Sequence, residues 1–300
     1  MRVALTGATG FLGGHVLRRL LAAGHAVRAL TRRAQDSRPG VEWMAGALDD
    51  ADALGRLCAG VEAVVHVAGV VNARDRAGFE QGNVAGTQAV LAAARAAGVT
   101  RFVHVSSLSA REPDLSDYGG SKARAEEVVL ESALDVRVVR PPAIYGPGDQ
   151  DNLELFKLAK RGVIPLPPGG RLSVIHADDL ARLIVTLAEA GTAPTLVEAD
   201  DGQPGGWSHV EWARAIAAAV GQRALPLPLP AAIIRAAAKA DRLVRGDQAR
   251  LTPDRASYFC HPDWVIDTRA RPSAALWQPE IETRKGLADT ATWYRAQGWL

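Results

Sequence analysis

A tyrosine and a lysine stand four residues apart in the segment Tyr118-Gly-Gly-Ser-Lys122. The chain has thirty Arg but only five Lys, and Lys122 is the only Lys before residue 157. A lysine ammonium, unlike a guanidinium, is a compact donor that can lie beside a phenol, favour its ionised form and hold sugar hydroxyls. The spacing therefore predicts an acid/base site. The alternative is a half-buried tyrosine at a helix N-terminus followed by a surface charge.

A glycine-rich loop follows the first apolar run of the chain, Arg2–Thr6, and precedes an amphipathic segment. Its glycine spacing is one residue wider than the usual dinucleotide fingerprint. Glycines let the backbone turn tightly and approach a pyrophosphate, and the free N–H groups at a helix start then face that anion. A flexible turn is the alternative. We expect a dinucleotide to contact Gly7, Thr9, Gly10, Phe11, Leu12 and Gly13.

Two arginines, Arg32 and Arg33, follow the second predicted strand at the point where an acid normally holds the adenosine ribose of NAD. An acid would repel a 2′-phosphate, whereas an arginine can bind it in a bidentate manner. The sequence therefore favours NADP(H) as the cofactor, with NAD(H) as the alternative. A solvated arginine pair in an Arg-rich chain is the other interpretation.

Short apolar segments alternate with helix-like segments through the first half of the chain. Strands are predicted at Arg2–Thr6, Ala26–Thr31, Val41–Met44, Ala63–Val67, Arg101–Val105 and Val136–Val139. Helices are predicted at Phe11–Ala23, Ala51–Cys58, Glu80–Ala97 and Ser121–Ala133. This order predicts an α/β fold with a doubly wound parallel sheet of the Rossmann type, covered by helices on both faces.

The alternation stops after Arg140, where prolines and glycines cluster. A strand at Leu172–Ile175 and a helix at Asp179–Ala190 are expected to return to the sheet. Further helices are predicted at Ser208–Val220, Ala231–Val244 and Lys285–Gln297. We therefore predict a dinucleotide-binding domain over 1–145 together with 171–198, and a smaller mixed α/β substrate lobe over 146–170 and 199–300.

Composition and charge argue against several function classes. The net charge is +2 and the arginines are scattered, which gives no support to nucleic-acid binding. No uncharged apolar run reaches membrane-spanning length, so membrane insertion is not expected. The apolar, proline-rich stretch Leu225–Ile234 is interpreted as a loop leading into a helix rather than as a membrane-touching surface.

The two cysteines and seven histidines indicate neither a disulfide nor a metal site. Cys58 and Cys260 fit reduced thiols, and the N-terminus has no signal-peptide pattern, so a cytoplasmic location is expected. The histidines show no H-x-x-x-H spacing, and the chain has no G-x-S-x-G, so we expect neither a metal site nor a hydrolase triad.

With these motifs in place, the chain resembles the extended branch of the short-chain dehydrogenase/reductase superfamily. This branch includes nucleotide-sugar epimerases and dehydratases, 3β-hydroxysteroid dehydrogenases and dihydroflavonol reductases. The resemblance covers nearly the whole chain. Besides the two motifs, it rests on the segments at 65–69, 83–87, 105–107, 140–148, 176–179 and 293–294.

The resemblance implies a role for each residue of a catalytic group. Tyr118 is the acid/base, Lys122 favours the phenolate and holds the nicotinamide ribose, and Ser107 hydrogen-bonds the substrate oxygen. Ser106 or Ser109 is the alternative to Ser107. In the reductive direction a hydride passes to a carbonyl carbon while Tyr118 protonates the oxygen, and oxidation reverses both steps.

The resemblance also assigns secondary positions. Further cofactor contacts are implied at Leu48, Ala68, Gly69, Pro141 and Ile144. The acid that usually precedes the position of Leu48 is Ala47 here, which puts one adenine contact in doubt. Asn83 is expected to bridge backbone groups rather than touch a ligand, and His176 with Asp178 to form a hinge between sheet and lobe.

One departure from the family pattern bears on the substrate. Ala143 stands where nucleotide-sugar enzymes of this branch commonly have a substrate-contacting Asn. We therefore expect an NADP-dependent oxidoreductase that acts on a carbonyl or alcohol of a largely apolar small molecule. The alternatives are a nucleotide-sugar epimerase or dehydratase with tightly bound cofactor, and a non-catalytic dinucleotide-binding sensor. A homodimer is compatible with all three.

Overall fold

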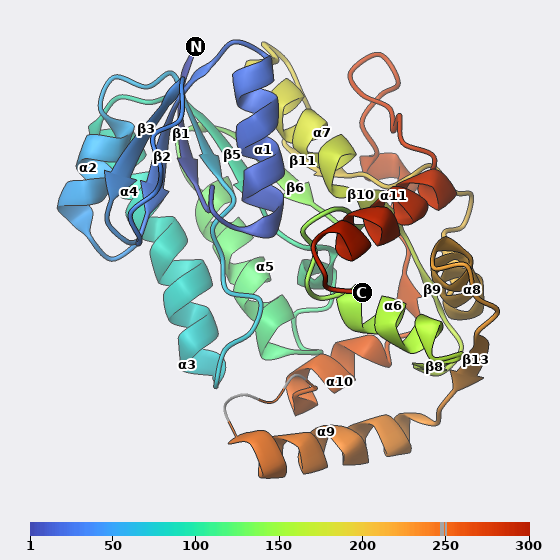
Figure 1. Cartoon of the computed structure of the whole chain (residues 1–300). Coiled ribbons are helices and arrows are strands. Elements are labelled where there is room, and N and C mark those ends of the chain that lie inside the picture. The colour runs from blue at the N-terminus through green and yellow to red at the C-terminus, as the bar shows by residue number, and fades with distance from the viewer. Residues whose placement is uncertain (247–248, 250) are drawn as a thin grey trace.

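Seven parallel strands form the central sheet of the computed structural model, which describes residues 1–246, 249 and 251–300 (Figure 1). The strands run in the order β11-β6-β5-β4-β1-β2-β3. They are β1 (Arg2–Thr6), β2 (Ala26–Thr31), β3 (Val41–Ala45), β4 (Ala63–His66), β5 (Arg101–Val105), β6 (Asp135–Arg140) and β11 (Leu196–Glu198). The chain moves outward from β1 to β3, crosses back and continues from β4 to the other edge. This is the doubly wound order, so the predicted fold class is confirmed.

Helices cover both faces of this sheet. α1 (Phe11–Ala22) and α7 (Ala177–Glu189) pack together on one face. The opposite face carries α2 (Ala51–Cys58), α4 (Gly86–Ala96) and α5 (Asp117–Leu130). Successive residues of β1 therefore point into two different apolar cores, which explains why its strand sequence is apolar throughout rather than alternating.

One predicted strand has a different partner from the expected one. The region of Leu172–Ile175 forms β9 (Arg171–Leu172) and β10 (Val174–His176), and neither joins the central sheet. β9 pairs with β12 (Trp207–Ser208), and β10 pairs with β7 (Ala143–Tyr145). The strand that returns to the sheet is β11, parallel to β6. A short apolar run does not encode which strand it pairs with, so the prediction that all of 171–198 returns to the sheet is wrong for 171–176.

Two predicted helices begin or divide differently. α5 begins at Asp117 rather than Ser121, because the Ser116 side chain caps it by accepting from the Gly119 backbone N–H. Tyr118 consequently lies in the first turn of α5. The helix expected at Glu80–Ala97 is divided into α3 (Arg76–Phe79), a π-helical segment η1 (Glu80–Ala85) and α4.

The remaining elements form a smaller unit beside the carboxyl ends of the strands. Its core includes Tyr145, Phe156 and Trp212. Its elements are α6 (Leu153–Lys160), β8 (Val163–Leu166), α8 (His209–Ala219), β13 (Leu225–Pro228), β14 (Asp263–Trp264), η4 (Thr268–Ala270) and α11 (Thr283–Ala296). The predicted helices at 208–220, 231–244 and 285–297 are confirmed within two residues at each end.

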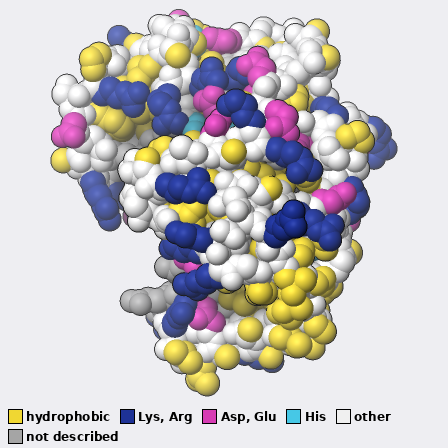
Figure 2. Space-filling model, turned by 45° about the vertical axis from the view of Figure 1, so that its right-hand side comes forward, with side chains coloured by type: hydrophobic (Ala, Val, Ile, Leu, Met, Phe, Trp, Pro, Cys, Tyr) yellow, Lys and Arg dark blue, Asp and Glu magenta, His cyan; other side chains and the backbone are white. Residues whose placement is uncertain are grey.

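The lowest part of the molecule in Figure 1 consists of α9 (Ala231–Arg245) and α10 (Pro253–Phe259). Figure 2 shows hydrophobic side chains gathered on the surface of this lower part. Within the described part of the chain, no helix combines the length and the hydropathy needed to cross a bilayer.

Candidate active site

A cleft of about 2300 Å³ runs along the carboxyl ends of the central strands and continues into the smaller unit. Loops at the carboxyl ends of parallel strands are where doubly wound folds bind ligands. All but one of the predicted site residues line this cleft. These are Gly7, Thr9, Gly10, Phe11, Leu12, Gly13, Arg32, Leu48, Ala68, Gly69, Ser107, Tyr118, Lys122, Pro141 and Ile144.

The glycine loop packs against backbone that leaves no room for side chains. A Cβ on Gly13 would lie 1.9 Å from the Gly7 carbonyl oxygen. Gly7 itself has a φ of +76°, and a Cβ there would lie 2.7 Å from the Ala68 nitrogen. Gly10 is the N-cap of α1, and no side chain caps the helix start within this fully described segment. The first N–H groups of α1 are therefore free for an anion, which fits the phosphates of a dinucleotide.

The two arginines after β2 differ in position. Both are exposed, but Arg32 lines the cleft and Arg33 does not. The backbone of Arg33 is held by the Thr31 hydroxyl, which donates to its carbonyl oxygen at 2.7 Å. The structure thus does not bring Arg33 to the predicted cofactor site, whereas Arg32 could reach a 2′-phosphate.

Three serines were candidates for the substrate contact, and their partners separate them. Ser106 is buried and donates to Glu126, whose carboxylate also accepts from Arg140. Ser107 lies in the cleft, where its oxygen accepts from the Ser109 hydroxyl at 2.8 Å and from the Ser109 backbone N–H at 3.2 Å. All three serines line the cleft, but Ser107 keeps its own hydroxyl proton for another acceptor, whereas Ser106 gives its proton to Glu126.

Tyr118 is held among aromatic rings at the centre of the cleft. Its ring centroid lies 6.0 Å from that of Phe79 and 6.4 Å from that of Tyr258. Burial raises the pKa of Tyr118 to about 12, and the hydrogen bond with Ser107 lowers it only in part. Desolvation thus outweighs the polar contacts of the phenol and favours its neutral form, and the role of the Lys122 ammonium in favouring the phenolate stays a prediction. The phenol is neutral and can act as an acid.

Lys122 is buried rather than a surface charge. Its side chain is one turn beyond Tyr118, and Nζ donates to the Val105 carbonyl oxygen at 2.8 Å. A Cβ on Gly69 would lie 3.5 Å from Nζ, so the ammonium also faces the loop after β4. Burial lowers the pKa of Lys122 to about 8, while Glu126 raises it.

The buried Lys122 should cost stability that depends on pH. Its folded pKa of about 8 is below the free value of 10.5, so between these values the unfolded chain binds more protons and stability rises with pH. The change in unfolding free energy that Lys122→Met causes, relative to wild type, should be more favourable near pH 7 than at pH 10.5. The difference should be roughly 3 kcal/mol, at 1.4 kcal/mol per pKa unit. Urea unfolding midpoints at both pH values measure this difference.

Lys285→Met is the matched control for this measurement, because Lys285 is exposed and pairs with Asp289 on the surface of α11. Its effect on stability should be small and nearly independent of pH. A pH-independent effect of Lys122→Met would contradict the assigned burial cost.

Asn83 bridges backbone groups, as expected. Its Oδ1 accepts from the Val70 N–H at 2.7 Å, and its Nδ2 donates to the Val70 carbonyl and to Ser121 Oγ. This amide ties the π-helical segment and the loop after β4 to α5. The contacts hold the loop that carries Gly69 against the helix that carries Lys122.

His176 and Asp178 make contacts of a structural kind. The backbone N–H of Asp178 donates to the His176 ring at 3.2 Å, and the Asp178 carboxylate pairs with Arg19 of α1. Contacts with His15 and Arg19 hold the pKa of Asp178 well below its usual range. These contacts join the start of α7 to α1.

Sequence reasoning missed the contribution of α10. The Asp254 carboxylate accepts from the backbone N–H of Asp117 at 2.6 Å, so α10 supplies an acceptor to the free N-terminus of α5. Arg255 and Tyr258 line the cleft next to Tyr118, and Arg255 lies 3.5 Å from Asp151. No local pattern in the sequence signals these contacts, because Asp254 lies 137 residues beyond Asp117 in the chain.

Comparisons with known proteins agree on the family. Residues 3–198 match the profile of the NAD dependent epimerase/dehydratase family. A ceramide reductase of Caulobacter vibrioides is 40% identical over 316 aligned residues, which cover 99% of this chain and 96% of the relative. The 4-hydroxy-2-methyl-3-oxo-4-farnesyl-3,4-dihydroquinoline-1-oxide ketoreductase of Stigmatella aurantiaca is 32% identical over 231 residues, or 68% of this chain and 69% of the relative.

A solved structure with bound NAD has the same fold. The dTDP-glucose 4,6-dehydratase of Streptomyces venezuelae superposes with a TM-score of 0.73 at 25% identity. The match covers 100% of this chain and 98% of that one.

Proposed function

The chain belongs to the NAD dependent epimerase/dehydratase family, within the extended short-chain dehydrogenases/reductases, and from this premise we propose that it is an NADP-dependent reductase. Its substrate would be a ketone carried by a lipid-like, largely apolar molecule. Ser107, Tyr118 and Lys122 would form the catalytic group.

The glycine loop and the small residues after β4 would hold the cofactor. The first backbone N–H groups of α1, which follow its N-cap Gly10, would face the phosphates, and Lys122 would hold the nicotinamide ribose. The bound cofactor would supply the hydride for the carbonyl carbon. Ser107 would donate a hydrogen bond to the carbonyl oxygen, and Tyr118 would give that oxygen its proton.

The observation that carries this proposal is the neutral phenol of Tyr118 beside the hydroxyl of Ser107. On one side of this pair the cleft is lined by the glycine loop, and on the other side by mainly apolar side chains. Because the pKa of Tyr118 is raised to about 12, the residue holds its proton under all ordinary conditions. Reduction of a ketone needs a proton donor at this position, whereas oxidation of an alcohol needs a base. The protonated phenol is the form that the reductive step consumes, and the same group in its deprotonated form would serve the oxidation.

The half of the cleft beyond Tyr118 is lined mainly by apolar side chains. They include Leu155, Leu158, Leu166, Leu172, Trp212, Leu229, Ile234, Leu251, Phe259 and Trp264. Such a lining gains free energy by covering a hydrocarbon chain and offers little to a sugar diphosphate. The names of the two relatives, a ceramide reductase and a farnesyl-dihydroquinoline ketoreductase, support the same substrate class.

A nucleotide-sugar epimerase or dehydratase is the second candidate, favoured by the fold match to the dTDP-glucose dehydratase. Two observations weigh against it. Ala143 lines the cleft where the branch commonly has an Asn, and Lys157, a cation of the lobe, lies 3.4 Å from Glu154. A non-catalytic sensor is disfavoured, because family sensors tend to lose the Tyr–Lys pair that is intact here.

The proposal is tested by following NADPH oxidation with purified protein. Long-chain ketones, among them the keto analogue of a ceramide, should be turned over, and a short-chain homologue should have a much higher KM because it lacks the buried hydrocarbon. UDP-glucose and dTDP-glucose should give no product. Turnover of either sugar nucleotide with tightly retained cofactor would favour the second candidate.

Arg32 should decide the preference for NADP over NAD. Arg32→Glu should weaken NADPH binding by about 100-fold, since a bidentate charged contact is replaced by repulsion, and leave NADH binding unchanged or stronger, since an acid at this position can accept from the ribose hydroxyl. Arg33→Glu is the matched control and should change either affinity by less than about threefold, because Arg33 lies outside the cleft. Fluorescence titration measures both; equal effects on NADPH and NADH would contradict the assignment.

A further inference from the structure

Helix α9 has an apolar face that no other part of the described chain covers. The face repeats at intervals of three and four residues along the helix, which places its members on one side. All of them are exposed: Ile233, Ala236, Ala237, Ala240, Leu243 and Val244. Leu243 is 87% and Val244 82% exposed. We refer to these six residues as the α9 stripe.

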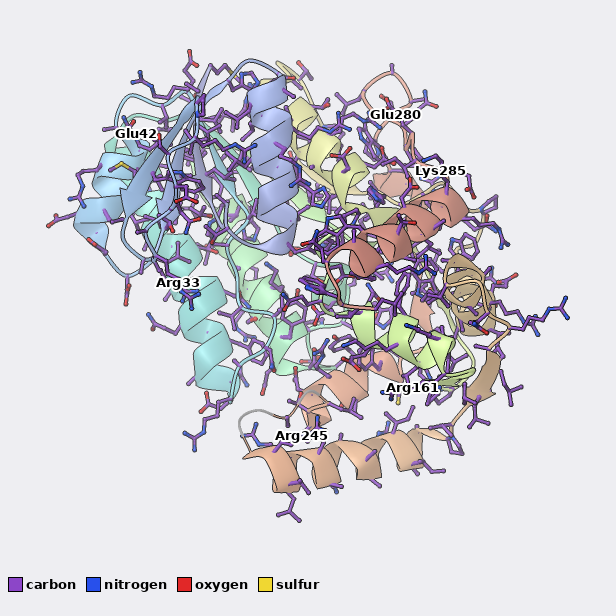
Figure 3. The ribbon with its side chains drawn as sticks, viewed as in Figure 1. Arg33, Glu42, Arg161, Arg245, Glu280 and Lys285 are labelled. Carbon is purple, nitrogen blue, oxygen red and sulfur yellow. The ribbon has the colours of Figure 1, made fainter. Side chains whose placement is uncertain are left out.

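Basic side chains border the α9 stripe. Arg235 and Lys239 are exposed along one edge, and Arg245 lies beyond the other, where it pairs with Asp241 at 3.3 Å. Figure 3 shows Arg245 at the end of α9. Residues 221–246 contain five basic residues and one acidic residue. An apolar stripe bordered by Lys and Arg is typical of a helix that lies in the interface of an anionic membrane.

The helix also forms one wall of the cleft mouth. Ile233, Ile234 and Ala237 line the apolar half of the cleft, and Ala238 is buried behind them. At its other end, Arg242 donates to the carbonyl of Arg74 at 3.2 Å, in the loop that follows β4. The helix therefore reaches from the lobe to the edge of the sheet domain.

The exposed hydrophobic surface continues beyond α9. Leu225 and Leu227 of β13 are 61% and 43% exposed, and Phe259 at the end of α10 is 39% exposed. These residues belong to the lower part of the molecule, where hydrophobic side chains gather in Figure 2. Exposed apolar area of this extent, next to a ligand cleft, marks an interaction surface rather than chance exposure.

We propose that the α9 stripe docks on the surface of a phospholipid bilayer with anionic headgroups. The stripe enters the acyl boundary while Arg235 and Lys239 contact phosphates, and the cleft mouth then opens at the membrane surface. That a lipid-like ketone enters the cleft by this route rests on the proposed function; the docking itself rests on the helix face and its charges. Basic edges favour an anionic membrane over a second copy of the same face, because like charges would then meet.

The test is co-sedimentation with vesicles, in the absence of cofactor and substrate. Wild type should bind vesicles of phosphatidylcholine with about 30% phosphatidylglycerol and bind pure phosphatidylcholine weakly, with the difference removed by salt. Leu243→Glu should reduce partitioning about tenfold or more, because an apolar side chain is lost from the acyl boundary and a charge is added. Arg235→Glu combined with Lys239→Glu should reduce binding to the anionic vesicles and not to the neutral ones.

Leu130→Glu is the matched control, since Leu130 is 45% exposed at the end of α5 and lies outside the stripe. It should bind vesicles like wild type. Leu243→Glu should keep the wild-type melting temperature and the wild-type turnover of a water-soluble ketone.

Three results would overturn the docking proposal: no vesicle binding by wild type, equal loss in Leu243→Glu and Leu130→Glu, or a dimer in light scattering that Leu243→Glu dissociates. The last result would assign the stripe to self-association. Vesicle binding that depends on Leu243, in a protein that reduces no long-chain ketone, would leave the docking intact and refute only the proposed function.

Discussion

Tyr118→Phe should lower turnover by about 1,000-fold or more while the affinity for NADPH stays within about twofold of wild type. The substitution removes one hydroxyl from a ring packed between Phe79 and Tyr258, so the ring contacts persist. The substitution removes the proton donor, a hydroxyl whose pKa of about 12 keeps it protonated. Single-turnover NADPH oxidation measures the chemical step, and quenching of protein fluorescence measures cofactor binding.

The neighbouring ring provides the matched control. Tyr258→Phe removes a hydroxyl from the same cleft, and burial and nearby acids raise the pKa of that phenol too. Because Tyr258 lies on α10 and not beside Ser107, its variant should keep turnover within a few-fold of wild type. If Tyr258→Phe were the inactive variant and Tyr118→Phe the active one, the acid would have to be reassigned to α10.

Gly13→Ala should raise the dissociation constant for NADPH by about 100-fold or more and lower stability by about 1–3 kcal/mol. The added Cβ would lie 1.9 Å from the Gly7 carbonyl oxygen and 2.5 Å from its carbon. Both contacts are with backbone, so α1 must move away from the loop. The N–H groups at the start of α1 then no longer converge with the loop on one phosphate site. Fluorescence titration and thermal unfolding measure the two effects.

Gly14→Ala is the adjacent control in the same helix. Its Cβ would come no closer than 3.9 Å to the Ala8 carbonyl oxygen, which is an ordinary contact. Replacing glycine by alanine within a helix is favourable by about 0.5–1 kcal/mol, so this variant should be slightly more stable and bind NADPH normally. Normal NADPH binding by Gly13→Ala would show that the close packing of loop and helix is not needed for the site.

Local contacts along the chain account for what the sequence predicted well. The glycine loop, the strand–helix order and the Tyr118–Lys122 spacing each depend on neighbours within about one turn or one strand. The fold class, the family and most cleft residues followed from them. Pairing across the sheet is not local, which is why the apolar run at Leu172–Ile175 was given the wrong partner while β11 took the sheet edge.

The sequence alone predicted that a loop of glycines, a tyrosine and a lysine lie at the carboxyl ends of parallel strands, because each motif follows a predicted strand of one doubly wound sheet. Only the tertiary structure decided their electrostatic state. Burial, which depends on distant segments such as α10, raises the pKa of Tyr118 and lowers that of Lys122. Tertiary packing likewise distinguished Ser107 from Ser106 as the substrate contact, because the hydroxyl of Ser106 donates to Glu126 and that of Ser107 does not. Desolvation and long-range contacts set chemistry that spacing cannot encode.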